Sequence, residues 1–299
     1  MNTPNQPHNT VWFITGASSG FGEEQAKLLL SRGYKVAVTS RDVSDVEHFV
    51  NEYPESALAL PLDVLKEDQI VSAVRETKDR FGRIDVLHNN AGYGSFGAME
   101  EYNRDEIIRQ FDVNLFGLIR LTQEVLPIMR EQESGTIINM SSVAGRVAFP
   151  GFGMYSATKH ALEGFSKGLA QEVEPFGIRV SLVEPGIFRT DFGGRSLMKV
   201  DRKIEAYAPA KKQVEDRIMA AYDNFDDSQG DPARAAQAIL KISEMKDVPL
   251  YLALGIDAYE NIGKQLDAER SALNTYGDLT KATAYKSKTN ILEDDLVNA

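Results

Sequence analysis

The sequence predicts an α/β protein with one doubly wound parallel sheet of about seven strands, and three observations support this fold class. Seven short apolar runs rich in β-branched residues are spaced along the chain up to about residue 255. The segments between them carry apolar residues at helical spacing, such as Ala26, Leu29 and Leu30. A glycine-rich turn directly follows the first run. Strands that alternate with helices form βαβ units, and right-handed crossovers between such units build a doubly wound sheet.

The apolar runs give the expected strands in chain order. Their apolar character is continuous rather than alternating, which indicates that each strand is covered on both faces. The expected strands are Thr10–Thr15, Lys35–Ser40, Ala57–Leu62, Ile84–His88, Gly135–Met140, Arg179–Val183 and Pro249–Leu254.

One long segment interrupts this alternation. No strand is expected between Asp191 and Gly230, and an insertion of that length in a compact domain is often a lid. We therefore expect a substrate lid at about 190–230 that is mobile and orders when ligands bind. Asp231 and Pro232 are then the N-cap and the first residue of the next helix.

The remainder of the chain is expected to extend this unit without adding another domain. The tail at about 257–299 has helical spacing over Asp257–Leu273 and is polar and expected to be loose over residues 280–299. The composition shows no internal repeat or linker that would divide the sequence. We expect residues 1–299 to form a single domain.

Composition and charge restrict the function classes. The 33 Lys and Arg residues against 44 Asp and Glu give a net charge of −11, which disfavours nucleic acids and anionic membranes as partners. The absence of cysteine excludes disulfides, thiol catalysis and thiolate metal sites. No Lys or Arg occurs in the first 26 residues, and no stretch approaches the 18 or so apolar residues of a membrane span. We expect a cytoplasmic protein.

The glycine-rich turn after the first strand is a candidate phosphate-binding loop. Glycine permits a positive φ and a close approach of ligand to backbone, and a helix amino terminus offers free N–H groups to a diphosphate. The alternative is a tight strand–helix turn without a ligand, because a lone glycine triplet is weak evidence. The candidate cofactor contacts here are Gly16, Ser18, Ser19, Gly20, Phe21 and Gly22.

Four motifs together resemble the short-chain dehydrogenases/reductases, over about residues 8–256. They are Thr15-Gly16-xxx-Gly20-x-Gly22, Asn89-Asn90-Ala91-Gly92, Tyr155-xxx-Lys159 and Pro185-Gly186. The stretch Arg189–Ser196 and the long tail resemble the 17β-hydroxysteroid-dehydrogenase-like members more narrowly. The resemblance implies a Rossmann-type fold and reversible hydride transfer between a nicotinamide cofactor and a carbonyl/alcohol pair.

Tyr155 and Lys159 form the centre of the candidate catalytic site. They are four residues apart in the helical segment Met154–Val173, so they share one helix face. A free tyrosine titrates near pH 10, and an ammonium about 4 Å away favours its ionised form by up to about 4 kcal/mol at an effective dielectric constant of 20. That effect would make Tyr155 a usable general acid/base. The alternative is a solvent-exposed Tyr/Lys pair.

Ser142 and Asn114 complete the candidate site. Ser142 follows an apolar strand, and in a parallel sheet ligands bind beyond the carboxyl ends of the strands, where a hydroxyl can contact a substrate oxygen. A turn serine is the alternative, and Ser141 is its competitor. The resemblance favours Ser142 by its spacing to Tyr155, and it implies that Asn114 holds a water in a proton relay behind Lys159. It thus implies the catalytic tetrad Asn114, Ser142, Tyr155 and Lys159.

The resemblance implies further cofactor contacts by position. They are Asp63 and Val64 at the adenine, Asn90, Ala91 and Gly92 after the fourth strand, Pro185, Gly186 and Ile187 beneath the nicotinamide, and Thr190 at its carboxamide, besides Tyr155 and Lys159 themselves. On chemistry alone, the carboxylate of Asp63 could equally be a helix cap.

The end of the second strand predicts the choice of nicotinamide cofactor. An acidic residue there binds the ribose 2′-hydroxyl of NAD, whereas this chain has neutral Ser40 followed by Arg41. A guanidinium matches a phosphate with two parallel hydrogen bonds, so we expect a preference for NADP(H), with NAD(H) possible. The alternative is a surface arginine paired with Asp42 or Asp45.

The remaining expectations concern substrate, metal and assembly. Six aromatic residues flank the site-forming segments and predict a pocket for a small apolar carbonyl or alcohol: Tyr93, Phe96, Phe149, Phe152, Phe188 and Phe192. The alternative is that they belong to the core, since aromatic residues at such places are as often core as pocket. His88 is expected to be a hydrogen-bonded structural residue, and no catalytic metal is expected. Apolar residues beyond one face of Arg104–Met129 favour a homodimer or homotetramer. A second hypothesis is a non-catalytic NADP(H)-sensing protein of the same fold.

Overall fold

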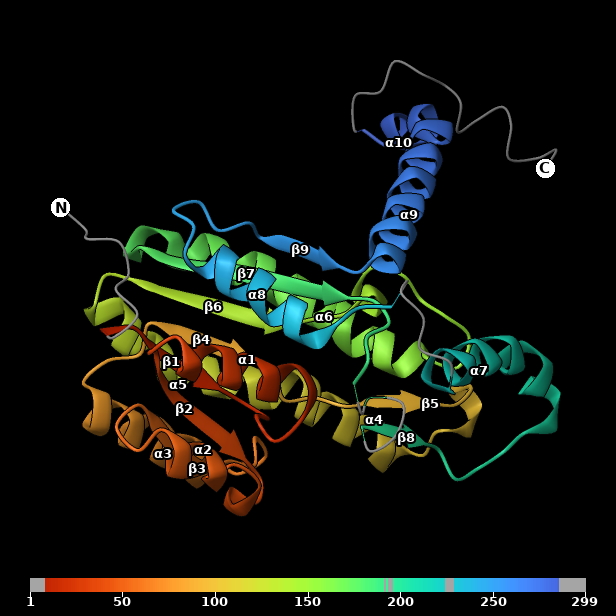
Figure 1. Ribbon diagram of the computed structural model, residues 1–299. Helices are drawn as coiled ribbons and strands as arrows, with labels where there is room; N and C mark the ends of the chain where they lie inside the picture. The colour runs from red at the N-terminus through yellow and green to blue at the C-terminus, as the bar shows by residue number, and fades with distance from the viewer. Residues whose placement is uncertain (1–8, 191, 193–195, 224–228, 285–299) are drawn as a thin grey trace, which may run out of the picture.

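Seven parallel strands form the central sheet of the protein. The computed structural model describes residues 9–190, 192, 196–223 and 229–284 (Figure 1). The strand order is β3-β2-β1-β4-β6-β7-β9, and every neighbouring pair is parallel. The strands are β1 (Val11–Ile14), β2 (Lys35–Ser40), β3 (Ala57–Pro61), β4 (Val86–Asn89), β6 (Gly135–Met140), β7 (Ile178–Pro185) and β9 (Tyr251–Leu254). All seven expected strands and the doubly wound fold class are confirmed.

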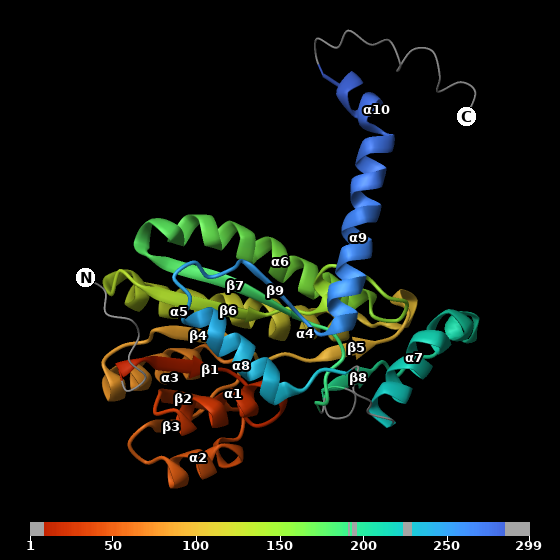
Figure 2. The same cartoon turned by 45° about the horizontal axis from the view of Figure 1, so that its top comes forward.

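Helices cover both faces of this sheet (Figures 1 and 2). One face carries α1 (Gly20–Ser31), α2 (Glu47–Glu52) and α8 (Pro232–Ser243), and the other carries α3 (Glu67–Phe81), α5 (Gly117–Glu131) and α6 (Gly153–Val173). Successive side chains of a strand point to opposite faces, so Trp12 and Ile14 join the apolar cluster on the α1 side and Phe13 the cluster on the α3 side. This double burial explains why the strands are apolar throughout.

The strand order places the candidate site. The first strand, β1, pairs with β2 on one side and with β4 on the other, so the chain changes direction across the sheet beside it. In open α/β sheets, ligands bind outside the carboxyl ends of the strands at this switch point. The loops after β1, β4 and β6 all emerge at that edge.

The expectation that residues 191–230 contain no strand is wrong. Leu197–Lys199 forms β8, which pairs in parallel with β5 (Gly94–Phe96) in a separate two-stranded sheet. Each strand has three residues, and their pairing joins segments about one hundred residues apart, so no local pattern announces either one. The rest of the segment includes α7 (Ala208–Asp223), while residues 191, 193–195 and 224–228 lie outside the described part of the chain.

Several element boundaries follow local chemistry. The Asp231 carboxylate accepts the Ala233 N–H at 2.8 Å and Pro232 is the first residue of α8, which confirms the expected cap. The expected helix Arg104–Met129 is interrupted: α4 (Arg104–Phe111) continues through a π-helical turn, Asp112–Phe116, into α5. The tail forms α9 (Ile256–Thr275) and α10 (Gly277–Ala282), so residues 280–282 are helical and not loose.

His88 differs from its expected role. It is fully buried, and neither ring nitrogen has a hydrogen-bond partner among the described residues. Its ring packs edge-on against Trp12, with 6.4 Å between the ring centroids. Burial lowers the pKa of His88 to about 3, so the ring stays neutral and behaves as an apolar core side chain.

No helix in the described ranges is both long enough and apolar enough to cross a bilayer.

Candidate active site

The turn after β1 is shaped by two glycines that need a positive φ. Gly16 has a φ of 66° and Gly20 of 58°, values that side chains disfavour. Gly22 is required by space, since a Cβ there would lie 2.4 Å from the Gly16 carbonyl oxygen. Asn90, from the end of β4, braces the turn by donating its amide to the Thr15 and Gly16 carbonyl oxygens at 2.9 and 3.0 Å. The conformation of the expected glycine loop therefore depends on these glycines and on the hydrogen bonds from Asn90.

This loop presents the open amino end of α1. The N-cap residue Ser19 makes no side-chain cap, so the first N–H groups of the helix are not consumed by it. Phe21 packs against Phe188, with ring centroids 4.9 Å apart, and Thr190 lies 3.6 Å from where a Cβ of Gly20 would stand. Half-buried Ser18 and Ser19 line the same turn. The donors and the space fit the diphosphate of a dinucleotide.

Tyr155 and Lys159 lie together on the first turns of α6. Tyr155 is buried, and the Lys159 Nζ stands 5.8 Å from the centroid of its ring. The same Nζ donates to the Met140 carbonyl oxygen at 2.6 Å, which ties the helix to the carboxyl end of β6. Burial lowers the pKa of Lys159 to about 8. The alternative of an exposed surface pair does not hold in this structure.

Asn114 reaches this pair from the π-helical turn. Its Oδ1 accepts the Tyr93 N–H at 3.0 Å, and its Nδ2 donates to the Tyr93 carbonyl oxygen at 2.9 Å and to Thr158 Oγ1 at 3.2 Å. A Cβ on Gly92 would lie 3.2 Å from Asn114 Oδ1 and 3.7 Å from Lys159 Nζ. The glycine thus leaves open space between the amide and the ammonium. Sequence reasoning missed the π-helical turn, a feature that often occurs at functional sites.

Ser142 and its competitor Ser141 have different surroundings. The Ser142 oxygen accepts the Ala144 N–H at 3.1 Å, which leaves its hydroxyl proton available to another acceptor. Ser141 is buried and donates its proton to Glu163 at 2.5 Å. Ser142 is therefore a half-buried serine whose hydroxyl can still donate, whereas the hydroxyl of the buried Ser141 already donates to Glu163.

Comparisons with known proteins agree with this geometry. A sequence model of the family described as short chain dehydrogenase matches residues 10–200. The oxidoreductase BOA17 of Botryotinia fuckeliana is 37% identical over 279 residues, which cover 92% of this chain and 99% of that protein. The crystal structure of a short-chain dehydrogenase from Streptomyces avermitilis has a TM-score of 0.85 at 40% identity, covering 92% of this chain and all of the other. The chain belongs to the short-chain dehydrogenase/reductase family.

Membership of this family makes the protein an oxidoreductase that uses a nicotinamide cofactor to interconvert carbonyl and hydroxyl groups. An alcohol dehydrogenase from the archaeon Thermococcus sibiricus, solved in complex with 5-hydroxy-NADP, is 26% identical to the chain. Its TM-score is 0.68, and the match covers 82% of this chain and 96% of the other. The narrower 17β-hydroxysteroid-dehydrogenase-like resemblance stays a prediction, and part of its Arg189–Ser196 stretch lies outside the described residues.

The family's remaining cofactor positions are found around the same edge. Asp63 accepts the Leu65 N–H at 3.0 Å, so one carboxylate oxygen caps the turn before α3, and the half-buried Val64 follows it. After β7, the backbone at Gly186 and Ile187 is held by Asp257, whose carboxylate accepts the Ile187 N–H at 3.0 Å. Sequence reasoning did not identify this role of Asp257. The remaining expected contacts also fall at this edge, Ala91 directly after Asn90 and Pro185 at the end of β7.

Arg41 is exposed at the end of β2 and forms no ion pair within the described part of the chain. The two acids that could have paired with it have other partners. Asp42 accepts from the Ser44 N–H and hydroxyl, and Asp45 accepts from the Ser40 hydroxyl at 3.3 Å. The alternative of a paired surface arginine therefore gains no support from the structure.

A buried acid that sequence reasoning missed stands next to the catalytic pair. Glu163 follows Lys159 by four residues on α6, and burial raises its pKa to about 7 even though Ser141 donates to it. Glu184, which forms an ion pair with Arg146 at 3.0 Å, adds to this rise, while Arg146 and Lys167 oppose it. The sequence did contain a signal for it, because Glu163 follows Lys159 at the same spacing of four residues at which Lys159 follows Tyr155.

Aromatic residues surround Tyr155. Phe96, Phe149, Phe152 and Phe192 join one apolar cluster with Tyr155, together with Ala144, Leu197 and Val214. The ring centroids of Phe152 and Phe192 lie 6.2 and 5.6 Å from that of Tyr155. Phe188 packs instead into the main core beside Phe21. Four of the six expected pocket aromatics thus gather at the site.

The lid segment is anchored over this cluster. Lys211 of α7 is buried and pairs with Glu101, whose pKa is lowered to about 2 by the hydrogen bonds from Lys211, Ile204 and Ala98 against the opposing effect of burial. Glu101 also accepts the Ile204 N–H at 2.9 Å. One of the basic side chains of the lid is therefore inaccessible to a protease in this conformation.

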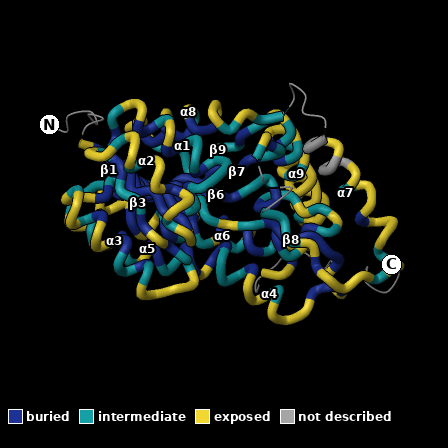
Figure 3. The backbone as a smooth tube through the Cα atoms, turned by 60° about the horizontal axis from the view of Figure 1, so that its bottom comes forward, coloured by how far each residue is buried: buried dark blue, intermediate teal, exposed yellow. Residues whose placement is uncertain are grey.

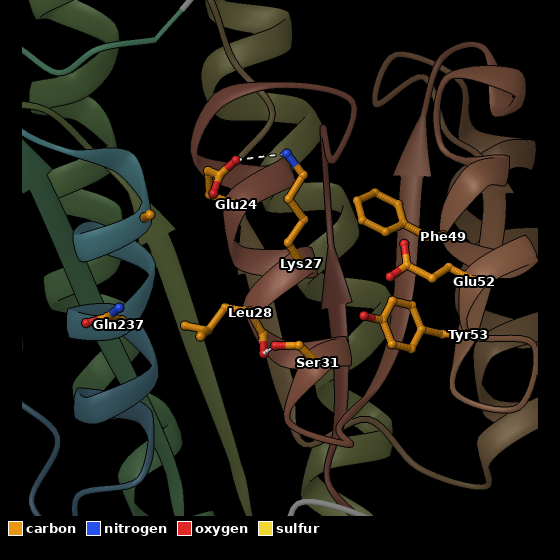
Figure 4. A pocket seen from close by; sticks show the side chains of 9 residues that line it. Glu24, Lys27, Leu28, Ser31, Phe49, Glu52, Tyr53 and Gln237 are labelled. Atoms are coloured by element: carbon orange, nitrogen blue, oxygen red, sulfur yellow. Dashed lines mark hydrogen bonds and ion pairs between the residues drawn. The ribbon is translucent and has the colours of Figure 1, made fainter.

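A separate surface hollow lies between α1, α2 and α8 (Figure 4). Its wall includes Lys27, which pairs with Glu24 at 2.9 Å, and Tyr53 of the loop after α2. None of the expected site residues lines this hollow. The hollow is therefore distinct from the expected site at the sheet edge.

Proposed function

We propose that the protein is an NADP(H)-dependent reductase of small apolar carbonyl compounds, acting reversibly on the corresponding alcohols, with Tyr155 as its general acid/base. The observation that carries this proposal is the position of Lys159. Its ammonium is 5.8 Å from the Tyr155 ring centroid and is tied to the strand end that bears Ser142. These contacts support a site in which Tyr155, Lys159 and Ser142 act together at the edge where ligands bind in such folds.

Each catalytic side chain has a distinct task. Tyr155 donates its hydroxyl proton to the carbonyl oxygen during reduction and takes it back during oxidation. Ser142 donates a hydrogen bond to the same oxygen. Lys159 stabilises the tyrosinate and binds the cofactor ribose, and Asn114, whose amide is engaged by Tyr93 and Thr158, positions the loop beside Lys159. When bound, the nicotinamide supplies or accepts the hydride.

The preference for NADP(H) rests on Arg41. An exposed guanidinium without an ion-pair partner among the described residues can offer two parallel hydrogen bonds to a 2′-phosphate. Ser40 adds no negative charge at the strand end. The cofactor's diphosphate would lie on the turn Gly16–Gly22, beside Thr190 and Asn90.

The aromatic cluster around Tyr155 sets the substrate class. Phe96, Phe152 and Phe192 are carbon-rich surfaces next to the proton donor, which favours an apolar body attached to the reacting carbonyl. Residues 190–230 would act as the lid of this pocket, because Phe192 and Leu197 belong to the cluster.

Cofactor-coupled turnover tests this function. Consumption of NADPH and of NADH is measured with ketones and aldehydes that range from small and polar to long-chain and aromatic. Faster turnover of apolar carbonyls with NADPH supports the proposal. Binding of NADPH without consumption in the presence of any carbonyl would instead identify a nucleotide sensor.

Replacing Glu163 with glutamine is expected to move the alkaline limb of the kcat/KM profile downward by roughly one pH unit. Below pH 7 the wild-type acid is neutral, as glutamine is, so the two proteins should agree. Above pH 7 the carboxylate raises the pKa of Lys159, and the variant loses this support. A charge several ångströms away is worth about 1–2 kcal/mol at an effective dielectric constant of 20, or about one pH unit.

Glu172→Gln is the matched control, because Glu172 is an exposed acid on the same helix. Its profile should follow that of the wild type. Identical profiles for Glu163→Gln and the wild type at every pH would limit Glu163 to a structural role.

Ligands are expected to protect the lid from trypsin. Lys199, Arg202, Lys203 and Lys212 are exposed in the segment, whereas Lys211 is buried against Glu101. Cleavage of the free protein should therefore start at the exposed sites and slow when NADPH and substrate are present. Equal cleavage rates in both states would contradict a lid that is ordered by ligands.

A homodimer or homotetramer remains the expected assembly. The helices α4 to α6 carry the surface proposed for it, and Ile108 and Phe116 are exposed there, whereas Leu115, Leu118 and Leu121 are buried within the protomer. The mass in solution by light scattering distinguishes these assemblies from a monomer.

A further inference from the structure

The helix α9 leaves the body of the protein. Figures 1 and 2 show it standing away from the sheet, with α10 at its far end. Its first turns are anchored, because Ala258 and Ile262 are buried against the body. Every residue from Leu266 to Tyr276 is exposed, and Figure 3 shows this part of the chain at the surface.

A helix in this position needs a partner. An isolated helix shorter than about 12–15 residues is marginal in water, and most helical stability in proteins comes from packing an apolar face. The free part of α9 stands away from the body of its own protomer, and it contacts α10 at its far end. It nevertheless carries large apolar side chains: Leu266 is 47% exposed, Leu273 58% and Tyr276 61%.

The apolar residues form one stripe with a regular repeat. Tyr259, Leu266 and Leu273 follow one another at intervals of seven residues, which is close to two helical turns and places them on one line. The opposite face carries Glu260, Lys264 and Ser271. The apolar line therefore continues into the half of the helix that stands away from the body.

The stripe is also symmetric about Leu266. Tyr259 and Leu273 lie seven residues to either side of it on the same line, whereas Ile256 and Tyr276, ten residues to either side, are turned about 80° away from that line. All five are exposed. A two-fold interface brings the same patch of two subunits together. A helix with apolar residues at equal distances on both sides of its centre can therefore pack against an antiparallel copy of itself.

We propose that α9 is a homodimerisation arm that packs antiparallel against α9 of a second copy of this chain. Leu266 of one copy then lies against Leu266 of the other, and Tyr259 against Leu273. The tip of each helix then reaches the base of the other. This contact is separate from the surface of α4 to α6.

Charge distinguishes this partner from other arrangements. In a parallel pair each residue meets its own copy, so Glu269, which flanks the stripe, would face a second carboxylate; the antiparallel pair separates the two by six residues, or about 9 Å. A membrane surface is a poor fit, because helices that lie on membranes have polar faces rich in Lys and Arg. The helix α9 carries four acids, Asp257, Glu260, Asp267 and Glu269, against only Lys264 and Arg270.

The surface area that a stable dimer must bury also favours contacts at both ends of the helix. A stable interface covers roughly 800 Å² per partner, more than a few crossing side chains supply. The antiparallel arrangement adds contacts between the tip of each arm and the partner's body, where Ile256 is 62% and Tyr259 77% exposed. Both ends of the stripe are then covered.

Single-cysteine cross-linking tests the arrangement directly, since the chain has no cysteine of its own. Leu266→Cys is expected to form a disulfide-linked dimer on mild oxidation. Leu273→Cys is not, because its copy lies at the other end of the pair, and neither is the control Lys264→Cys on the opposite face. Cross-linking of both Leu266→Cys and Leu273→Cys, but not of Lys264→Cys, would indicate a parallel pair and overturn the proposal. Equal cross-linking of all three variants, or of none, would also overturn it.

Mass in solution provides the second measurement. Leu266→Glu places a charge at the centre of the seam and is expected to halve the mass measured by light scattering at micromolar concentration. Its NADPH affinity should match that of the wild type, because Leu266 touches neither the core nor the site. An unchanged mass would mean that α9 has another occupant, such as residues 285–299 or a different protein, and would refute the homodimer arm.

Discussion

Replacing Tyr155 with phenylalanine is expected to reduce turnover at least about 100-fold while leaving cofactor affinity nearly unchanged. The variant loses only the hydroxyl group that carries the proton. The ring contacts with Phe152 and Phe192 involve carbon faces and edges that phenylalanine retains. The loss should appear in kcat for both reduction and oxidation.

Tyr102 provides a matched control for this substitution. It is another buried tyrosine near the site, and its hydroxyl donates to Ser95 at 2.8 Å. Tyr102→Phe removes a buried hydroxyl without removing the proposed acid, so turnover should stay within a fewfold of the wild type. If Tyr155→Phe kept wild-type turnover, another group would have to supply the proton, and the catalytic assignment would be wrong.

Removing the Arg41 guanidinium is expected to weaken NADP(H) binding roughly 10- to 150-fold, because hydrogen bonds to a charged group are worth about 1.5–3 kcal/mol. NAD(H), which lacks the 2′-phosphate, should be little affected by Arg41→Ala. The double variant Ser40→Asp, Arg41→Ala should reverse the preference, since a carboxylate at the strand end accepts from the ribose hydroxyl and repels the phosphate. Fluorescence titration with NADPH and NADH measures both constants.

Ser40→Asp places a carboxylate at a buried position whose hydroxyl already lies 3.3 Å from an Asp45 oxygen, which can impair folding of the double variant. The single variant Arg41→Ala does not have this problem and is sufficient for the test. Arg32→Ala is the charge-matched control: Arg32 is exposed at the carboxyl end of α1, away from the cofactor edge. It should leave both constants unchanged. A wild-type protein that bound NADH as tightly as NADPH would remove the basis for the NADP(H) preference.

The outcomes for individual residues show where sequence reasoning was sufficient. The loop glycines were predictable because their roles depend on local backbone geometry: Gly16 and Gly20 adopt a positive φ, and Gly22 leaves no room for a side chain. Tyr155 and Lys159 were predictable because a helix brings residues four apart onto one face. The same rule would have included Glu163, had its burial been known.

Other residues depended on contacts that no local pattern encodes. The role of Asp257 at the Ile187 N–H joins positions seventy residues apart, and the Glu101–Lys211 pair joins positions 110 apart. His88 was expected to be hydrogen-bonded, but neither of its ring nitrogens has a partner among the described residues. The polarity of the residue therefore did not predict its environment.

By itself, the sequence determined the seven-stranded parallel sheet, the glycine-rich turn after the first strand and the family. These features are encoded in short segments of the chain or in motifs that follow one another in a fixed order. Only the tertiary structure decided which side chains meet. It paired β5 with β8, committed Ser141 to Glu163 and left the Ser142 proton available, and exposed the stripe of α9. The physical reason is that segments far apart in the sequence determine which side chains are buried and which are paired. The free energy of a side chain depends on the groups that these segments place around it.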